Sequence, residues 1–118
     1  MVRLERLAEA ALNGEALLLR SLTQDWLIEN PVISDSPAPL SEDPQVLVVA
    51  AALVELFAER MRQAAPSWSG RIGSLAEPHY LLRAARTMKH LRKLCETESP
   101  VPLRRRNLYA PGDFLQFV

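Results

Sequence analysis

Cysteine, histidine and glycine are scarce in this sequence: its 118 residues include one cysteine, two histidines and four glycines. A single cysteine, Cys95, cannot close an intrachain disulfide, which excludes a disulfide-bonded secreted scaffold and is typical of a reducing compartment. His79 and His90 are eleven residues apart, about 16 Å along a helix, so they cannot share a metal ion within one chain. We therefore expect no metal site and no cofactor.

Long hydrophobic runs and signal segments are also missing. Charged and apolar residues alternate in residues 1–6, where a secretory signal peptide needs an apolar core. The most apolar stretch, residues 46–58, would span only about 20 Å as a helix, against roughly 30 Å for the hydrocarbon core of a bilayer. The sequence predicts a cytoplasmic protein with no membrane contact.

Catalytic motifs are absent as well. The sequence has no phosphate-binding glycine loop, no G-x-S-x-G and no H-E-x-x-H. Cys95 falls on the apolar stripe of a predicted helix and is interpreted as a buried structural thiol. Glu55, inside an apolar helix, is either an acid–base group with a raised pKa or, as we favour, a carboxylate at a polar edge or paired with an arginine. We expect no catalytic residue; an enzyme with a pocket around Glu55 and His79 or His90 is the weakest alternative.

Helical periodicity is the strongest pattern that the sequence does contain. Apolar residues recur at steps of three and four from Leu4 to Trp26, which predicts a helix over about residues 3–29. Gly14 interrupts this stretch, but the apolar phase continues across it, so we favour one bent helix over two. Asp43-Pro44 is an N-cap followed by an N1 proline and predicts a second helix over 44–64.

A third helix is predicted over 78–97, after Glu77-Pro78. The fold class is therefore all-α: one domain over residues 1–118, with a small three-helix bundle, or a four-helix bundle if the first helix is split at Gly14. A proline-containing tail over 99–118 follows, and its prolines predict an extended path over 99–103. No stretch alternates with a period of two, so no sheet is expected.

Charge is balanced overall, with 14 basic and 14 acidic residues, but it is unevenly placed. Residues 1–77 contain six basic and eleven acidic side chains, whereas residues 78–106 contain eight basic and two acidic ones. The interpretation we favour is the solvated side of an amphipathic helix, or a segment that the acidic N-terminal half neutralises within the chain; the alternative is a basic face that binds an acidic protein or phosphates. The residues of this predicted basic face are Arg83, Arg86, Lys89, Arg92, Lys93, Arg104, Arg105 and Arg106.

The tail carries five large apolar side chains, at Leu108, Tyr109, Phe114, Leu115 and Phe117. The burial energy of such side chains nearly equals the entropy lost on ordering the segment, so the tail needs a preformed groove. We expect this groove between the first and third helices or on a second subunit. Arg104 to Arg106 are then expected to meet acids of the N-terminal half, such as Glu5, Glu9 and Asp25.

The C-terminal part also resembles a known group of proteins. Residues 94–100, read as LCETESP, and 103–115, read as LRRRNLYAPGDFL, are similar to the ends of small uncharacterised bacterial helical proteins. Some of these proteins resemble partners in toxin–antitoxin gene pairs. The resemblance implies a bacterial, antitoxin-like interaction protein and carries over no activity, cofactor or site residue.

These patterns together predict a protein–protein interaction or regulatory partner. We expect it to act as a homo-oligomer or bound to another protein, because three helices leave apolar surface uncovered. The alternative is a nucleic-acid-binding protein that uses the basic third helix and Arg104 to Arg106.

Overall fold

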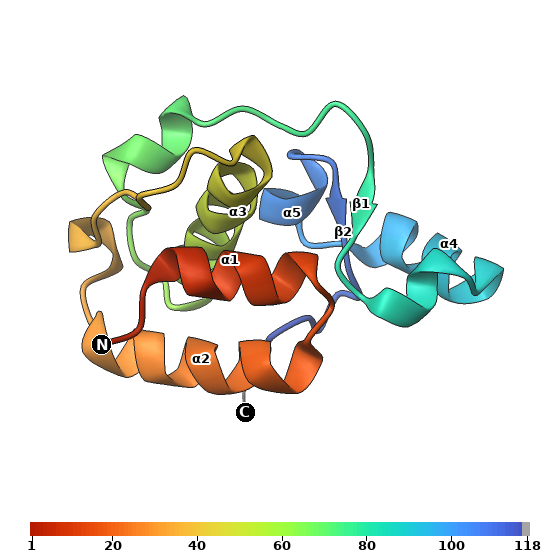
Figure 1. The fold of residues 1–118 in the computed structure, drawn as a ribbon, viewed down its shortest axis with the longest axis horizontal. Coiled ribbons are helices and arrows are strands. Elements are labelled where there is room, and N and C mark those ends of the chain that lie inside the picture. Colours follow the sequence, from red (N-terminus) through yellow and green to blue (C-terminus); the bar gives the residue numbers. More distant parts are fainter. Residues whose placement is uncertain (117–118) are drawn as a thin grey trace.

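The structure, a computed structural model, describes residues 1–116 and is mostly helical (Figure 1). The α-helices are α1 (Leu4–Leu12), α2 (Ala16–Glu29), α3 (Pro44–Arg60), α4 (Lys89–Glu98) and α5 (Val101–Arg104). Short 3-10 helices occupy Ile33–Asp35, Ser67–Arg71 and Arg83–Arg86, and two-residue strands form β1 (His79–Tyr80) and β2 (Leu108–Tyr109). The predominance of helix confirms the all-α prediction in its coarse form.

The central helix is α3. The side chain of Asp43 accepts a hydrogen bond from the backbone N–H of Gln45 at 2.9 Å, so the predicted cap and N1 proline start this helix. All residues from 48 to 58 are buried. α1 packs against both α3 and α2, and α2 forms the outer layer along the lower edge of Figure 1.

The prediction of one helix over residues 3–29 is wrong, because α1 ends before Gly14. Gly14 has a φ of +69°, and its N–H donates to Ala11 O at 3.1 Å while the N–H of Glu15 donates to Ala10 O at 3.0 Å. This pair of hydrogen bonds around a left-handed glycine is a Schellman motif, which satisfies the last carbonyls of a helix. The apolar phase continues across the turn because both α1 and α2 bury one face on the same core.

The prediction of a helix over 78–97 is wrong over its first half. β1 pairs in parallel with β2; the N–H of His79 donates to Asn107 O at 3.0 Å and that of Leu81 to Tyr109 O at 2.9 Å. These backbone groups are therefore satisfied by the tail, and α4 begins only at Lys89. The expectation of no sheet is also wrong, for this one short pair of strands.

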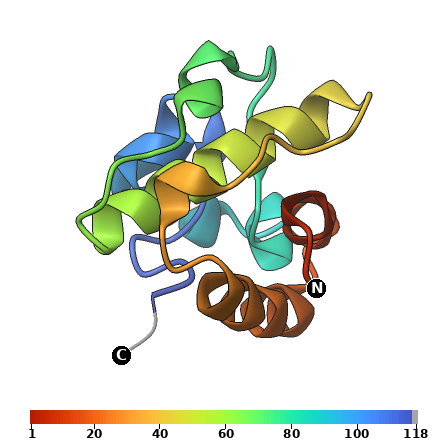
Figure 2. The same ribbon diagram turned by 90° about the vertical axis from the view of Figure 1, so that its left-hand side faces the viewer.

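The tail is not extended after Pro100. Pro102 lies in the first turn of α5, where its missing N–H removes no helical hydrogen bond. Beyond α5 the chain runs back along β1 and then past α2 and the end of α3 (Figure 2). The guanidinium of Arg60 donates to Gly112 O at 3.3 Å and to Phe114 O, which fixes this last segment to α3.

Among residues 1–116, no helix is long and apolar enough to cross a lipid bilayer.

Candidate functional site

The eight residues of the predicted basic face do not share one surface. Arg83 and Arg86 reach the C-terminal end of α1, where Arg83 Nη2 donates to Asn13 O at 2.5 Å and Arg86 Nη2 to Leu12 O at 3.0 Å. The last carbonyls of a helix carry partial negative charge and have no partner within it. These two arginines therefore stabilise the end of α1.

Arg92 is also used within the chain. Its guanidinium donates to Ala85 O at 3.2 Å and to Arg86 O, and it lies 5.7 Å from the centre of the Tyr80 ring. The hydroxyl of Tyr80 donates to Glu96; this hydrogen bond, helped by burial, raises the pKa of Tyr80 to about 12. Arg92 and Tyr80 therefore hold α4 against the segment that precedes it.

Arg106 is buried, with 6% of its surface exposed, so its assignment to an exposed basic face is wrong. Its Nη2 lies 2.8 Å from Glu55 Oε2 and also donates to Ser69 O at 2.9 Å, while Nε donates to Glu55 Oε1 at 3.2 Å. Its Nη1 donates to Gly73 O at 2.9 Å and to Ile72 O. All five N–H groups of the guanidinium are thereby used.

Glu55 is an ion-pair partner, as one of the sequence interpretations held. Arg105 Nη2 lies 2.8 Å from its other oxygen, Oε1. Burial alone would raise the pKa of Glu55, but the hydrogen bonds from Arg106 and Arg105 outweigh it and lower the pKa. The alternative of an acid–base group with a raised pKa is therefore wrong, since this carboxylate is ionised at neutral pH.

The partners expected for the arginine run were Glu5, Glu9 and Asp25. Arg105 and Arg106 do pair with an acid of the N-terminal half, as expected, but it is Glu55 and none of these three examples. Sequence periodicity places Glu55 on the central helix but does not show that the turn after α5 lies beside it.

His79 and Cys95 are packed inside the chain. His79 Nε2 lies 3.3 Å from Arg86 Nη2; a guanidinium has no acceptor, so Nε2 accepts and the imidazole is neutral. Burial, followed by the charge of Arg86, lowers the pKa of His79. Cys95 is buried as predicted, and burial raises the pKa of its thiol. No group of three or more potential metal ligands lies together within residues 1–116.

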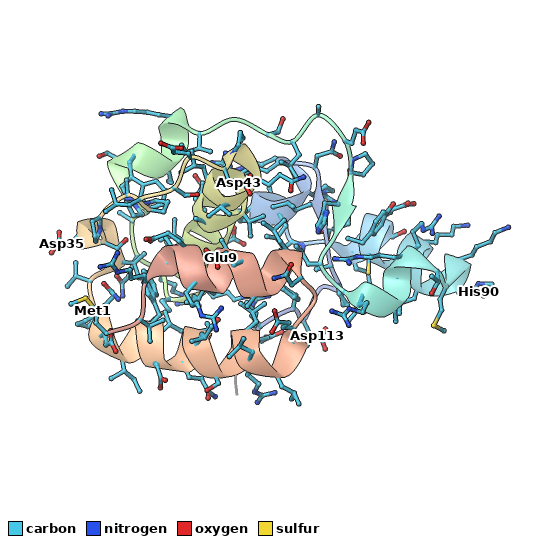
Figure 3. All side chains as sticks on the ribbon, viewed as in Figure 1. Met1, Glu9, Asp35, Asp43, His90 and Asp113 are labelled. Atoms are coloured by element: carbon cyan, nitrogen blue, oxygen red, sulfur yellow. The ribbon has the colours of Figure 1, made fainter. Side chains whose placement is uncertain are left out.

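Of the three remaining residues of the predicted basic face, Lys89 and Lys93 lie on α4 and Arg104 lies on α5. Lys89, His90 and Lys93 are exposed, beside Met88 at 56% and Leu94 at 42% exposure; these five residues are called the α4 surface below. Within residues 1–116 neither lysine forms an ion pair. Figure 3 shows His90 at the outer tip of α4, pointing away from the molecule.

The charges of α4 run against its helix dipole. Lys89 and His90 lie in the first turn, which has no acidic residue and no side-chain cap, and Glu96 and Glu98 lie toward the C-terminal end. Cations near a helix N-terminus and anions near its C-terminus both reduce helix stability. Only Cys95 of this helix is fully buried; Leu91 and Arg92 are half-buried, and polar contacts of Arg92 and Glu96 supply the rest of its attachment.

A groove opens between the α1–α2 turn, Leu81 and Leu82, and the tail. It has a volume of about 350 Å³ and mostly apolar walls. Three charged residues, Glu15, Arg20 and Asp113, also line it, and all three are exposed. We call it the α1–α2 groove; its lining includes Ala10, Ala16, Leu19, Leu81, Phe114 and Leu115. Sequence reasoning missed this groove, although Gly14 marks the turn that forms one end of it.

The predicted docking tail is placed as follows. Leu108 is fully buried, and Tyr109, Phe114 and Leu115 are half-buried; Phe114 and Leu115 pack against the core cluster. Phe117 lies outside the described residues. Arg104 is exposed on α5.

Comparisons with protein-family models, curated proteins and solved structures give no match to this chain, so the resemblance to toxin–antitoxin partners stays a prediction.

Proposed function

We propose that this chain is a protein-interaction module that binds its partner through the α4 surface. The observation that supports the proposal is that α4 has few stabilising interactions of its own. An isolated helix of ten residues is marginal in water, and this one fully buries a single side chain and opposes its own dipole. A partner that covers the α4 surface and neutralises its lysines would stabilise the helix.

The side chains of the α4 surface indicate the chemistry of that partner. Two lysines and a histidine are exposed on α4 together with Met88 and Leu94. This combination suits carboxylates next to apolar side chains, as on an acidic protein surface. An antitoxin-like regulatory role in a bacterial cytoplasm is the biological setting that the sequence predicts for such a module.

A nucleic-acid partner is less well supported. Of the eight basic residues predicted to contact phosphates, Arg83, Arg86, Arg92, Arg105 and Arg106 donate to groups of the chain itself. The remaining cations are few for a duplex-binding surface, which gains its affinity from many phosphate contacts.

Site-specific photocrosslinking in cells that naturally express the gene tests the proposal. A photoreactive amino acid at His90 reports on the α4 surface, and one at exposed Gln24 of α2 is the matched control. We expect position 90 to yield a discrete protein adduct that disappears when Lys89→Glu and Lys93→Glu are added, and position 24 to yield none.

Three outcomes would contradict the proposal. They are the absence of any adduct at position 90, an adduct that the two charge reversals leave unchanged, and adducts that nuclease treatment removes. The last of these would support nucleic-acid binding.

A further inference from the structure

A polar pocket opens beside the ion pair of Glu55 and Arg106, where the segment after the 3-10 helix Ser67–Arg71 passes the turn that follows α5 (Figure 1). Its volume of about 390 Å³ lies within the range of pockets that take a small molecule. We infer that this pocket, called the Arg105 pocket below, binds the carboxylate group of a small molecule through the guanidinium of Arg105. No residue of the α4 surface lines it, so the inference does not rest on the proposed function.

Arg105 is the basic residue of this pocket that keeps hydrogen-bond donors for a ligand. Its side chain is 56% exposed, and among residues 1–116 its guanidinium donates to Glu55 Oε1 alone, at 2.8 Å. A guanidinium carries five N–H donors in a planar fork that matches the two oxygens of a carboxylate. Arg106 also lines the pocket, but its donors are used within the chain. An anion in the pocket would therefore be bound by Arg105.

The remaining walls of the pocket leave room for a ligand and add one more donor. Gly70 and Gly73 line it without side chains, and apart from the neighbouring residues no heavy atom lies within 4 Å of the place that a Cβ would take at either glycine. Ser74 lines the pocket as well and is exposed. Its hydroxyl can donate to a ligand oxygen that the guanidinium of Arg105 leaves unbound.

The charges of the pocket favour an anion with a single negative charge. Two guanidinium groups line it, and Glu55 is the only acid among the described residues that do so, which leaves one net positive charge. Arg71 lies between two of the lining residues in the chain and adds positive potential to the same segment. A carboxylate would balance the charge of Arg105, whereas a doubly charged phosphate would place excess negative charge next to Glu55.

The experiment is a titration of the purified full chain with acetate, the simplest stable carboxylate with a methyl group, followed by backbone amide chemical shifts. Sodium acetate replaces sodium chloride at constant ionic strength, so that screening of the surface charges stays the same. We expect saturable shifts at Gly70, Gly73 and Ser74, with a dissociation constant of about 1–20 mM. Gly14, which lines the α1–α2 groove, is the internal control and should not shift.

Matched variants connect the binding to this pocket. Arg105→Met should raise the dissociation constant of acetate roughly tenfold or more, because the fork that binds both oxygens is lost. Arg104→Met removes the same charge from an exposed residue outside the pocket and should leave the constant within about twofold of wild type. Ser74→Ala leaves both ion pairs of Glu55 intact and should raise the constant about two- to fivefold. Amide shifts away from the substituted residue should match wild type in all three variants, because Arg106 still pairs with Glu55.

Shifts that do not saturate overturn the inference, as do shifts centred on Lys89 and Lys93 of α4 or binding that Arg105→Met leaves unchanged. Inorganic phosphate is titrated in the same way, and we expect it to bind more weakly than acetate. Tighter binding of phosphate would contradict the assignment of the pocket to a carboxylate. Because the α4 surface plays no part in this titration, its result is independent of the crosslinking result at position 90.

Discussion

Arg106 joins three parts of the chain that are far apart in sequence. Its guanidinium binds Glu55 on α3, Ser69 in the following 3-10 helix, and the carbonyls of Ile72 and Gly73. A buried guanidinium whose donors are all hydrogen-bonded favours one arrangement of the segments it joins. This holds only while its counter-charge stays in place. The ion pair with Glu55 is therefore a structural clamp on the tail.

Removing Arg106 should be much more damaging than removing Arg105, although both pair with Glu55. Arg106→Met leaves Glu55 buried with one exposed partner and should lower the free energy of unfolding by about 3–5 kcal/mol. The side chain of Arg105 is 56% exposed, so Arg105→Met should cost about 0–1 kcal/mol. Chemical denaturation of both variants checks this, and equal losses would contradict the clamp.

His79 gives the fold a dependence on pH. Burial and the charge of Arg86 lower its pKa in the folded chain below the ordinary 6.5. The unfolded chain therefore binds a proton first as the pH falls, so stability is complete above about pH 7.5 and declines as the pH drops through 6.5. Carboxylates stay largely ionised until lower pH.

The free energy of unfolding, measured between pH 7.5 and 5.5, tests this sign. The chain has two histidines, so comparing the variants His79→Gln and His90→Gln shows which histidine causes the loss of stability at lower pH. We expect His79→Gln to flatten the decline and His90→Gln to retain it. A decline that survives in His79→Gln would assign the pH dependence to another group.

Residue-scale predictions from the sequence succeeded where the signal was local. The cap at Asp43 and the burial of Cys95 depend on neighbours within one helical turn or on one apolar stripe. The α1 carbonyls that Arg83 and Arg86 bind, and the partners of Arg106, lie between 33 and 74 residues away, and no pattern in a single sequence reports such distances. The basic residues were for that reason assigned to one surface, although Arg106 is buried, Arg86 and Arg92 are half-buried, and five of the eight donate to acceptors of the chain itself.

At the scale of elements, the main errors of sequence-based prediction arose because apolar periodicity carries no information on which distant segments pair. The apolar stripe over 81–95 fits a helix, yet residues 79–81 extend because the tail supplies their hydrogen-bond partners. Gly14 shows the opposite case, since a local backbone conformation with positive φ ends α1 although the stripe continues. Tertiary contact and turn chemistry each override periodicity at these points.

The opposed dipole of α4 predicts a stabilising substitution. Lys89→Glu replaces a cation in the first turn by an anion and should raise the free energy of unfolding by about 0.3–1 kcal/mol. Lys93→Glu lies beyond the first turn and should gain less, because the effect falls off within one turn. Unfolding at a few micromolar, where association is minimal, measures both; a loss of stability in Lys89→Glu would contradict this account of α4.

At the scale of the whole molecule, the uneven charge of the sequence has two outcomes. Part of the basic C-terminal third neutralises groups of the N-terminal part, as Arg106 does for Glu55 and Arg83 and Arg86 do for the end of α1. The remainder, Lys89 and Lys93 on α4 and Arg104 on α5, faces solvent. The asymmetry was visible in the sequence, but only the packing of the tail shows which charges are left for a partner.

The tail should contribute to stability in two steps, which a pair of truncations separates. Removing residues 111–118 deletes half-buried Phe114 and Leu115 and the carbonyls that bind Arg60. Half-buried side chains of this size are worth about 1 kcal/mol each, partly offset by the entropy of ordering the segment. We expect the melting temperature to fall by several degrees while unfolding stays cooperative.

Removing residues 107–118 should reduce the stability of the fold much more than removing residues 111–118. This truncation also takes away fully buried Leu108 and Ala110, the carbonyls that pair with His79 and Leu81, and the acceptor of the Ser99 hydroxyl. Unsatisfied buried donors then add to the loss of core, so we expect no cooperative thermal transition. Calorimetry of both truncated chains measures the two steps. Equal melting temperatures for the two truncated chains would mean that β2 adds no stability beyond that of the last segment. An unchanged melting curve without residues 111–118 would mean that the segment carrying Phe114 and Leu115 makes no net contribution to the stability of the fold.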